Sequence, residues 1–467
     1  MPLKVAYDIS TLATDYGRPD AITGINRVSG DLLEELSKRN DLEMTAVALH
    51  GDDPLDVGTR AALYLDDRNA PPACGFEYTF DYGRRLTTAY KAVFRRMLKA
   101  EPYLPNGHRP RAQSLRYMRS AVRRLAYYHR VVFPLGLFDR TRFDVFHCPH
   151  WIVPPADRTR RVPRVFTVYD LIPIVRPEFV DPPHAEYFEQ LLSRIDIERD
   201  WVVCISEFTR MEFCERTGMS LDRVKVAPLA AEDFFRPVTD SDLIASTRAR
   251  YGIPEGEYFL CLAAPQPRKN LAHLIHSFFR LLDEQQLPDT TLVLAGSKGQ
   301  GWMYDEIFAA AASSERHRSR FIFTDFVAEE DLAPLYSGAV AFVYPSLYEG
   351  FGLPALEAMA CGTPVITSNT TSLPEVAGDA AVLVSPTDPD ELCDAMTTVL
   401  LDQSLRGELR ARGRARATQF SWKRCADITA EVYHLAAAEA REQRVRRGDA
   451  TGAVLETLQP APQSTRH

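Results

Sequence analysis

Short apolar segments rich in β-branched residues alternate with segments of helical periodicity along almost the whole chain. A strand–helix–strand order forms parallel pairs, so this alternation predicts parallel sheets with helices on both faces. Strands are expected at Leu3–Ile9, Met44–Ala48, Val145–Cys148, Arg164–Val168, Trp201–Ile205, Val224–Ala227, Tyr258–Ala263, Thr291–Ala295, Arg320–Phe323, Ala339–Tyr344, Pro364–Thr367 and Ala381–Val384. Helices are expected at about 25–39, 207–217 with Ser206 as N-cap, 304–312, 329–335, 390–401, 405–418 and 422–438, and from Asn270 onward. We therefore predict an α/β fold of doubly wound parallel sheets.

A length of 467 residues exceeds what one hydrophobic core usually serves, which favours two domains. The polar stretch Arg236–Asp240 contains a proline and separates two series of strands, so we place the boundary there. The expected domains are 1–236 and 237–418, followed by a terminal helix over 419–440. Residues 441–467 are polar and without pattern, and are expected to be disordered.

The composition, 45% hydrophobic and 25% charged, is that of an ordinary soluble globular protein. No apolar run reaches the roughly 18 residues that span a bilayer, and the N-terminus is expected to be a strand and not a signal peptide. The eight cysteines lack zinc-site spacing. We expect a cytoplasmic protein without a disulfide framework or structural metal.

A basic segment lies between the second and third expected strands. Residues 84–130 contain 13 Arg or Lys residues, with Glu101 as the single acid and tyrosines interleaved. Helix-compatible stretches at Leu86–Leu98 and Ser114–Val131 could lie on an anionic membrane surface, which would make the protein peripheral at the inner face of the membrane. The alternatives are a solvated helical face and a basic patch for an anionic acceptor. No nucleic-acid-binding module accompanies the charge, so nucleic acid is not expected as a partner.

Two glutamates, Glu349 and Glu357, flank a glycine-rich loop that follows an apolar strand and leads into a helix. Gly350 and Gly352 allow a ligand to approach the backbone closely, and the start of the helix offers free N–H groups and a positive dipole end. Carboxylates beside an anion site suit a nucleoside diphosphate that carries hydroxylated groups. The alternative is a buried turn whose glycines only shape the backbone.

The run from Tyr344 to Pro364, with Leu373-Pro-Glu375-Val-Ala-Gly378 after it, resembles the E-x7-E signature of glycosyltransferase family 4. The resemblance covers most of the chain and is strongest over residues 258–384. It implies the GT-B fold, in which two Rossmann-like domains enclose a cleft and the terminal helix crosses back to the first domain. It also implies retaining transfer of a sugar from a nucleoside-diphosphate donor.

The resemblance assigns donor-site roles to residues of the second domain. Pro267-Arg268-Lys269-Asn270 looks like the family element in which Arg and Lys hold the donor diphosphate. Fixed cations there stabilise the negative charge that builds on the leaving phosphate. Donor contacts are further implied for Gly296, Phe326, Val327, Gly350, Phe351, Gly352, Leu353 and Glu357, with Glu357 at the ribose and Glu349 at the sugar.

Residues of the first domain are implied on the acceptor side. Thr23-Gly24-Ile25-Asn26-Arg27 forms a strand–helix turn where Gly24 approaches the donor phosphate and Arg27 is a phosphate or acceptor contact; Asn26 stands where the family usually has a second glycine. His150 ends another expected strand.

The motif Tyr169-Asp170 also departs from the family, because Tyr169 replaces its usual histidine. Asp170 is counted with the catalytic residues Arg268, Lys269 and Glu349. Its alternative role is a cap on the next turn.

No Asp-x-Asp motif follows a strand in a metal-binding setting, and Asp388-Pro-Asp390 fits a helix N-cap instead. We therefore expect no metal and no cofactor, with Arg268, Lys269 and the helix dipole in place of a divalent ion.

The motifs Thr23-Gly-Ile, Phe146-His-Cys-Pro and Tyr169-Asp-Leu-Ile-Pro look most like the mannosyltransferase-like branch that builds bacterial surface polysaccharides. This implies transfer of a hexosyl group, with mannose as the best guess, to a sugar hydroxyl of a glycan or glycolipid acceptor. The alternatives are a GT-B sugar-nucleotide epimerase, which needs no acceptor, and a non-catalytic protein that only binds nucleotide sugars.

Overall fold

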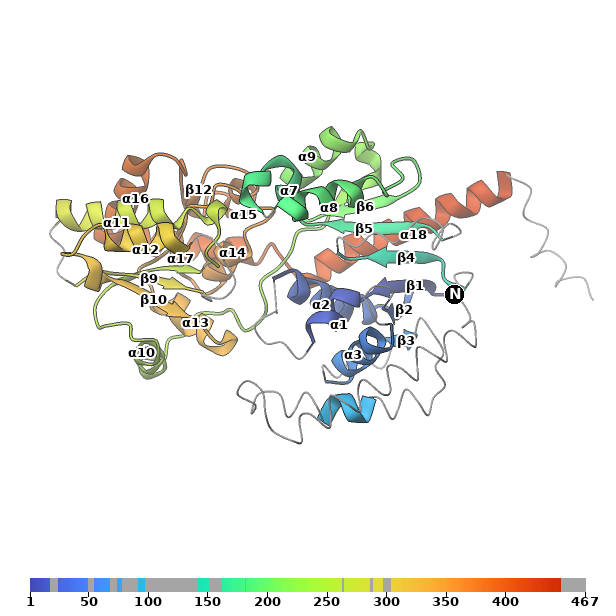
Figure 1. The fold of residues 1–467 in the computed structure, drawn as a ribbon, viewed down its shortest axis with the longest axis horizontal. Helices are drawn as coiled ribbons and strands as arrows, with labels where there is room; N and C mark the ends of the chain where they lie inside the picture. Colours follow the sequence, from blue (N-terminus) through green and yellow to red (C-terminus); the bar gives the residue numbers. More distant parts are fainter. Residues whose placement is uncertain are drawn as a thin grey trace, which may run out of the picture. The chain divides into compact units, whose positions relative to one another are not determined.

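The structure of the protein is a computed structural model (Figure 1), which describes residues 1–16, 24–48, 54–67, 74–77, 91–96, 142–150, 162–180, 182–262, 264–285, 289–296 and 304–446. Two parallel sheets organise these residues. The first has seven strands in the order β3-β2-β1-β4-β5-β6-β7, and the second has six in the order β10-β9-β8-β11-β12-β13. In both, strand order reverses next to the first strand in the chain, as in doubly wound folds.

The seven strands of the first sheet are β1 (Leu3–Asp8), β2 (Leu42–Val47), β3 (Gly75–Glu77), β4 (Val145–Cys148), β5 (Arg164–Val168), β6 (Trp201–Cys204) and β7 (Val224–Val226). Those of the second are β8 (Tyr258–Leu262), β9 (Thr291–Ala295), β10 (Phe321–Asp325), β11 (Ala341–Tyr344), β12 (Val365–Ser368) and β13 (Ala381–Val384). The central strands are almost completely buried, which is why they read as continuous apolar runs.

The α-helices in the first half are α1 (Ser10–Asp15), α2 (Gly24–Ser37), α3 (Pro54–Asp67), α7 (Ile172–Val175), α8 (Pro182–Leu192) and α9 (Glu207–Thr217). Those in the second half are α10 (Ser241–Arg250), α11 (Leu271–Gln285), α12 (Tyr304–Ala312), α13 (Glu329–Gly338), α14 (Leu353–Ala360), α15 (Leu373–Ala377), α16 (Pro389–Leu401), α17 (Gln403–Ala417) and α18 (Trp422–Arg446). Figure 1 shows α11, α12 and α16 on one face of the second sheet and α10 and α13 on the other. None of the helices described is long and apolar enough to cross a membrane.

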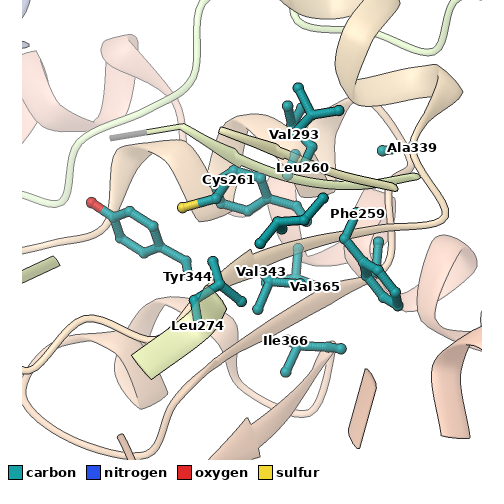
Figure 2. Close-up of a cluster of buried hydrophobic side chains, with 14 of the residues drawn as sticks. Phe259, Leu260, Cys261, Leu274, Val293, Ala339, Val343, Tyr344, Val365 and Ile366 are labelled. Carbon is teal, nitrogen blue, oxygen red and sulfur yellow. The ribbon is translucent and has the colours of Figure 1, made fainter. Parts of the chain in front are cut away.

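The second sheet and its helices enclose one large hydrophobic core. Phe259, Leu260 and Cys261 of β8 lie in it with Val343 of β11 and Val365 of β12 (Figure 2). Each of these side chains is at most 1% exposed. Burial on this scale is the main source of stability of the second sheet.

By its contacts the chain divides into two compact units. The first unit consists of Met1–Thr167, Ser193–Val203 and Asp427–His467, and the second of Val168–Leu192 and Cys204–Ala426. The sheets themselves change between β7 and β8, on either side of the stretch Arg236–Asp240. The domain bounds drawn from the sequence stay a prediction.

Every predicted strand is present, with ends that differ by at most two residues from the expected ones. The N-cap predictions are also confirmed: Ser206 Oγ accepts from Thr209 N, and Asp388 caps α16 by accepting from two backbone N–H groups. The three-residue strand β3 and the helices α1, α3, α7, α8, α10 and α15 were not predicted. The helices α3 and α8 begin with prolines, which are uncommon inside helices but are tolerated in a first turn.

The prediction that the disordered tail begins at residue 441 is wrong, because α18 continues to Arg446. Residues 441–446 are polar but good helix formers, and Glu442 and Arg446 pair across one turn. The rest of the predicted tail lies outside the described residues, as does the predicted basic helix Ser114–Val131.

Candidate active site

The Arg268–Lys269 pair lies on a short 3-10 helix, η6 (Pro267–Lys269), which directly precedes α11. Asn270 follows in the left-handed conformation, with φ of 58°, and turns the chain into α11. Its Nδ2 donates to the carbonyl oxygens of Pro345 (3.2 Å) and Pro386 (2.6 Å). The turn that carries both cations is thereby fixed to the loop after β11.

Glu349 lies between the two cations. Its Oε2 is 2.6 Å from Arg268 Nη1 and its Oε1 is 2.6 Å from Lys269 Nζ. The side chains of Glu349 and Lys269 are each only 9% exposed. Burial disfavours the charged carboxylate, but the charges of Arg268 and Lys269 outweigh it and lower the pKa of Glu349 to about 2. The three residues form a buried cluster with two positive charges and one negative charge, which we call the donor clamp.

The Lys269 ammonium is held close to its titration point. Burial and the neighbouring Arg268 charge lower its pKa to about 8, although the Glu349 carboxylate acts in the opposite direction. The cluster therefore carries a net positive charge at neutral pH and loses part of it in mildly alkaline solution. A buried site with this charge suits an anionic ligand.

Asp170 lies beside the donor clamp, within the same unit. Burial raises its pKa to about 6, against the lowering effect of the Arg268 charge. Its Oδ1 also accepts from Ile172 N at 3.0 Å, so the capping role predicted as the alternative is present as well. Asp170 therefore caps the following turn, and the Arg268 charge of the donor clamp also affects its pKa.

Gly350 is required for a reason that the sequence analysis did not foresee. A Cβ at this position would lie 2.0 Å from the Tyr169 carbonyl oxygen and 2.9 Å from Asp170 Cβ. The backbone that approaches Gly350 is thus the chain itself, at the predicted site residues 169 and 170. Gly352 has φ of 105°, a conformation that favours glycine, at the N-cap of α14, and Pro354 occupies the first turn, where proline is tolerated.

Glu357, predicted at the donor ribose, lies on α14 and is 2% exposed. The Tyr336 hydroxyl donates to its Oε2 at 3.2 Å. The ribose contact stays a prediction; in this structure the carboxylate is already hydrogen-bonded within the protein.

The remaining predicted donor residues of the second unit lie at the ends of strands or next to them. Gly296 follows β9, Phe326 and Val327 follow β10, and Phe351 and Leu353 frame the start of α14. The Phe326 side chain is 59% exposed, whereas Val327 is buried. Their donor contacts stay predictions.

The site residues predicted for the first domain are only partly accessible; they are Gly24 at the donor phosphate and Arg27, His150 and Tyr169 on the acceptor side. Gly24 is the first residue of α2 and is exposed, and Arg27 is half-buried. His150 is 1% exposed, and its Nδ1 lies 2.8 Å from Thr11 Oγ1. Tyr169 is 5% exposed and belongs to the second unit. In this structure the His150 side chain is therefore packed and hydrogen-bonded inside the protein, and its acceptor contact stays a prediction.

The described part of the basic segment is the short helix 91–96 of the first unit. Lys91 Nζ is 2.7 Å from Asp66, and Arg95 Nη2 is 3.0 Å from Asp67. Phe94 is 1% exposed, with Arg60 packed over its ring. In this stretch two of the cations are paired with α3, so any membrane surface must be sought elsewhere in the segment.

Two family models match the chain, Glycosyltransferase Family 4 over residues 22–231 and Glycosyl transferases group 1 over residues 244–416. O-antigen chain mannosyltransferase B of Escherichia coli is 33% identical over 291 residues, which are 62% of this chain and 74% of that protein. The chain belongs to glycosyltransferase family 4. It is a glycosyltransferase, as the resemblance predicted.

The serotype-specific mannosyltransferase WbdA of Escherichia coli is 36% identical to this glycosyltransferase over 274 residues, 58% of this chain but only 33% of WbdA. The chain thus matches about a third of the length of that relative. Among solved structures, sucrose-phosphate synthase from Thermosynechococcus elongatus superposes with a TM-score of 0.59 at 21% identity, covering 94% of this chain and 100% of that one. The predicted GT-B fold of two Rossmann-like domains is confirmed.

Sequence analysis missed Glu375 as a structural element of this glycosyltransferase. Its carboxylate accepts from Glu207 N at 2.8 Å and from Phe208 N at 3.2 Å, so it caps α9 from another element, α15. On α9, Thr209 Oγ1 donates to the Gly350 carbonyl oxygen at 3.3 Å. The Leu-Pro-Glu motif was the only signal, because a cap from 168 residues away leaves no local pattern.

Asp170→Asn should stabilise the glycosyltransferase at neutral pH. The folded pKa of about 6 lies above the value of about 3.9 in an unfolded chain, so the unfolded state binds fewer protons between these pH values. The charge of Asp170 therefore costs stability as the pH rises from about 4 to about 6, and the cost stays complete above that range. Thermal melts from pH 4 to pH 8 should show a higher Tm for the variant at about pH 7 and no difference near about pH 4. A constant difference across this range would contradict the assignment.

Proposed function

We propose that the protein is a retaining hexosyltransferase that moves mannose from a nucleoside-diphosphate sugar, GDP-mannose first among the candidates, to a sugar hydroxyl of a growing surface glycan. The observation that carries the proposal is the buried donor clamp of Arg268, Lys269 and Glu349 in a chain of glycosyltransferase family 4. The choice of mannose is supported by the relatives of known name, which include mannosyltransferases that act on the O-antigen chain.

In the proposed reaction the bond between the anomeric carbon and the phosphate oxygen breaks, and the acceptor hydroxyl oxygen bonds to the same face of that carbon. The electron pair of the broken bond stays on the diphosphate, which takes the acceptor proton on a phosphate oxygen. Arg268 and Lys269 stabilise the growing phosphate charge more than that of the bound donor, which lowers the barrier. Glu349 accepts a hydrogen bond from a sugar hydroxyl and so orients the ring. A side-chain base is not required.

Metal independence is part of the proposal. In metal-dependent enzymes a divalent ion neutralises the charge on the leaving phosphate. In this proposal the fixed cations Arg268 and Lys269 do so instead. Within the described ranges no group of three or more His, Cys, Asp or Glu side chains could hold a metal ion. Activity that is retained after chelation would support this part, and activity restored only by a divalent ion would refute it.

The acceptor in this proposal is a glycan, with a lipid-linked form as the version that would give the basic segment 84–130 a role at an anionic membrane surface. This would place the protein in the cytoplasm at the inner face of the membrane. The abundance of Arg and Lys in the segment supports the idea, while the ion pairs of helix 91–96 reduce the charge that is available.

A thermal-shift series with GDP-mannose, UDP-glucose and dTDP-glucose tests the donor. The protein should be stabilised most by GDP-mannose, because a ligand that binds only the folded state raises the Tm with its affinity. GDP release should then require an acceptor glycan, and NMR of the product should show the anomeric configuration of the donor. An epimerase would convert the donor without acceptor, and a binding protein would show the shift without turnover.

A further inference from the structure

Tyr344 lies at the end of β11, where the core of the second sheet meets the donor clamp. Its side chain is 1% exposed, and its ring stacks on Phe342 at a centroid distance of 5.6 Å. Figure 2 shows the ring near Cys261, with the hydroxyl oxygen directed away from the other labelled side chains. The phenol thus anchors its ring in the apolar core and presents its hydroxyl where the charged residues gather.

The hydroxyl contacts the Lys269 ammonium of the donor clamp, and we call this Lys269–Tyr344 hydrogen bond the bridge. It accepts a hydrogen bond from Lys269 Nζ, and the Lys269 ammonium also lies 4.7 Å from the centre of the ring. Burial together with the neighbouring Glu349 carboxylate raises the pKa of the phenol well above its ordinary value, so the hydroxyl is neutral. Lys269 Nζ also donates to Glu349 Oε1 at 2.6 Å, so the ammonium is held between a neutral phenol and a carboxylate.

A lysine ammonium has three N–H donors. For Lys269, Tyr344 and Glu349 take two of them, and among the described residues no third acceptor is recorded. The third N–H is therefore left for a ligand. An ammonium held at two points by protein groups can present its third donor without the rotamer entropy that a mobile lysine would lose on binding.

We propose that Tyr344 is a positioning residue of the sugar transfer, whose hydroxyl fixes the Lys269 ammonium against Glu349 and leaves the third N–H for the leaving phosphate. This rests on the proposed function for the identity of the ligand, but the two hydrogen bonds that hold the Lys269 ammonium exist without it. Phenylalanine would keep the ring packing and remove only the bridge.

The charged form of Lys269 depends on every group around it. Burial and Arg268 disfavour the ammonium, Glu349 favours it, and Cys261 of β8 is a neutral thiol because burial raises its pKa to about 12. The Tyr344 oxygen is a further acceptor for the charged form. Its removal leaves a buried N–H without a partner, which favours the neutral amine.

Lysine labelled with 13C allows the pKa of Lys269 to be measured by NMR in the protein without ligand. In the wild type it should lie near 8. In Tyr344→Phe it should fall by about one unit, since a hydrogen bond to a charged group contributes on the order of that free energy. Tyr258→Phe is the matched control: that hydroxyl is also buried in the second unit, but it donates to the Leu335 carbonyl oxygen. Equal titration in both variants would overturn the bridge.

Steady-state kinetics with GDP-mannose then test the positioning role. Tyr344→Phe should lose about tenfold to hundredfold in kcat/KM, mainly through kcat, and its alkaline limb should move to lower pH. Tyr258→Phe should keep the position of that limb even where its Tm falls. A shifted Lys269 titration with unchanged kcat/KM would refute the role in transfer. If the wild type showed no transfer with any donor, the proposed function would be refuted. The NMR titration of Lys269 would still test the hydrogen bond from Lys269 to Tyr344.

Discussion

Glu349→Ala should lower the transferase activity by about 10²–10³-fold and should also destabilise the second unit. The substitution leaves Arg268 and Lys269 buried without their carboxylate. Loss of one partner of a buried ion pair costs about 3–5 kcal/mol of unfolding free energy. Lys269 would escape part of that cost by giving up its proton, because its pKa is already lowered to about 8. The donor clamp would then have lost the carboxylate that accepts a hydrogen bond from the sugar, and part of its positive charge.

Urea denaturation and donor-dependent activity measure the two effects separately. Glu349→Gln keeps the shape and one acceptor oxygen, so it should recover part of the stability but little of the activity. Glu408→Gln is the surface control, since its ion pair with Arg412 is solvent-exposed and should contribute less than about 1 kcal/mol. Full activity in Glu349→Ala would refute the assignment of the donor clamp.

The fold was largely predictable because its strands are buried on both faces. A central strand such as β11 reads as an unbroken apolar run, and parallel order follows from the helices between the strands. Elements that lie at an edge or begin with proline, such as β3 and α8, carry no comparable pattern. The end of α18 was missed for the opposite reason, since an exposed polar helix looks like a polar tail.

The candidate site was predictable as a set of residues but not as an arrangement. Glu349, Arg268 and Lys269 lie in recognisable local motifs, and the structure brings them together over about 80 residues of sequence. The arrangement depends on distances between segments far apart in the chain. These distances let Glu349 neutralise one of the cations, Gly350 pack on residue 169, and Tyr344 accept a hydrogen bond from Lys269. No local pattern encodes such distances.

The donor clamp contains its own anion, and this bears on how a diphosphate would bind. Glu349 already pairs with both cations in the protein without ligand. A donor diphosphate therefore meets preoriented cations rather than mobile ones, which reduces the entropy lost on binding. It must also share those cations with the carboxylate, whose negative charge weakens the binding of the diphosphate.

Lys269→Met is expected to lower kcat by about 10²–10³-fold, the usual effect of removing one fixed donor to a developing negative charge. The stability at neutral pH should change much less, because the variant also removes a buried ammonium and keeps the Arg268–Glu349 pair. In the wild type kcat/KM should fall above about pH 8, where Lys269 loses its proton and can no longer stabilise the leaving phosphate.

Lys269→Arg separates charge from shape. A guanidinium stays protonated throughout the measurable range, so this variant should be less active than the wild type but free of the decline above about pH 8. In Lys269→Met the same decline should vanish, since the titrating group is gone. If the alkaline limb persisted unchanged in both variants, it would belong to another group, and Lys269 would not be the cation whose charge the transfer requires.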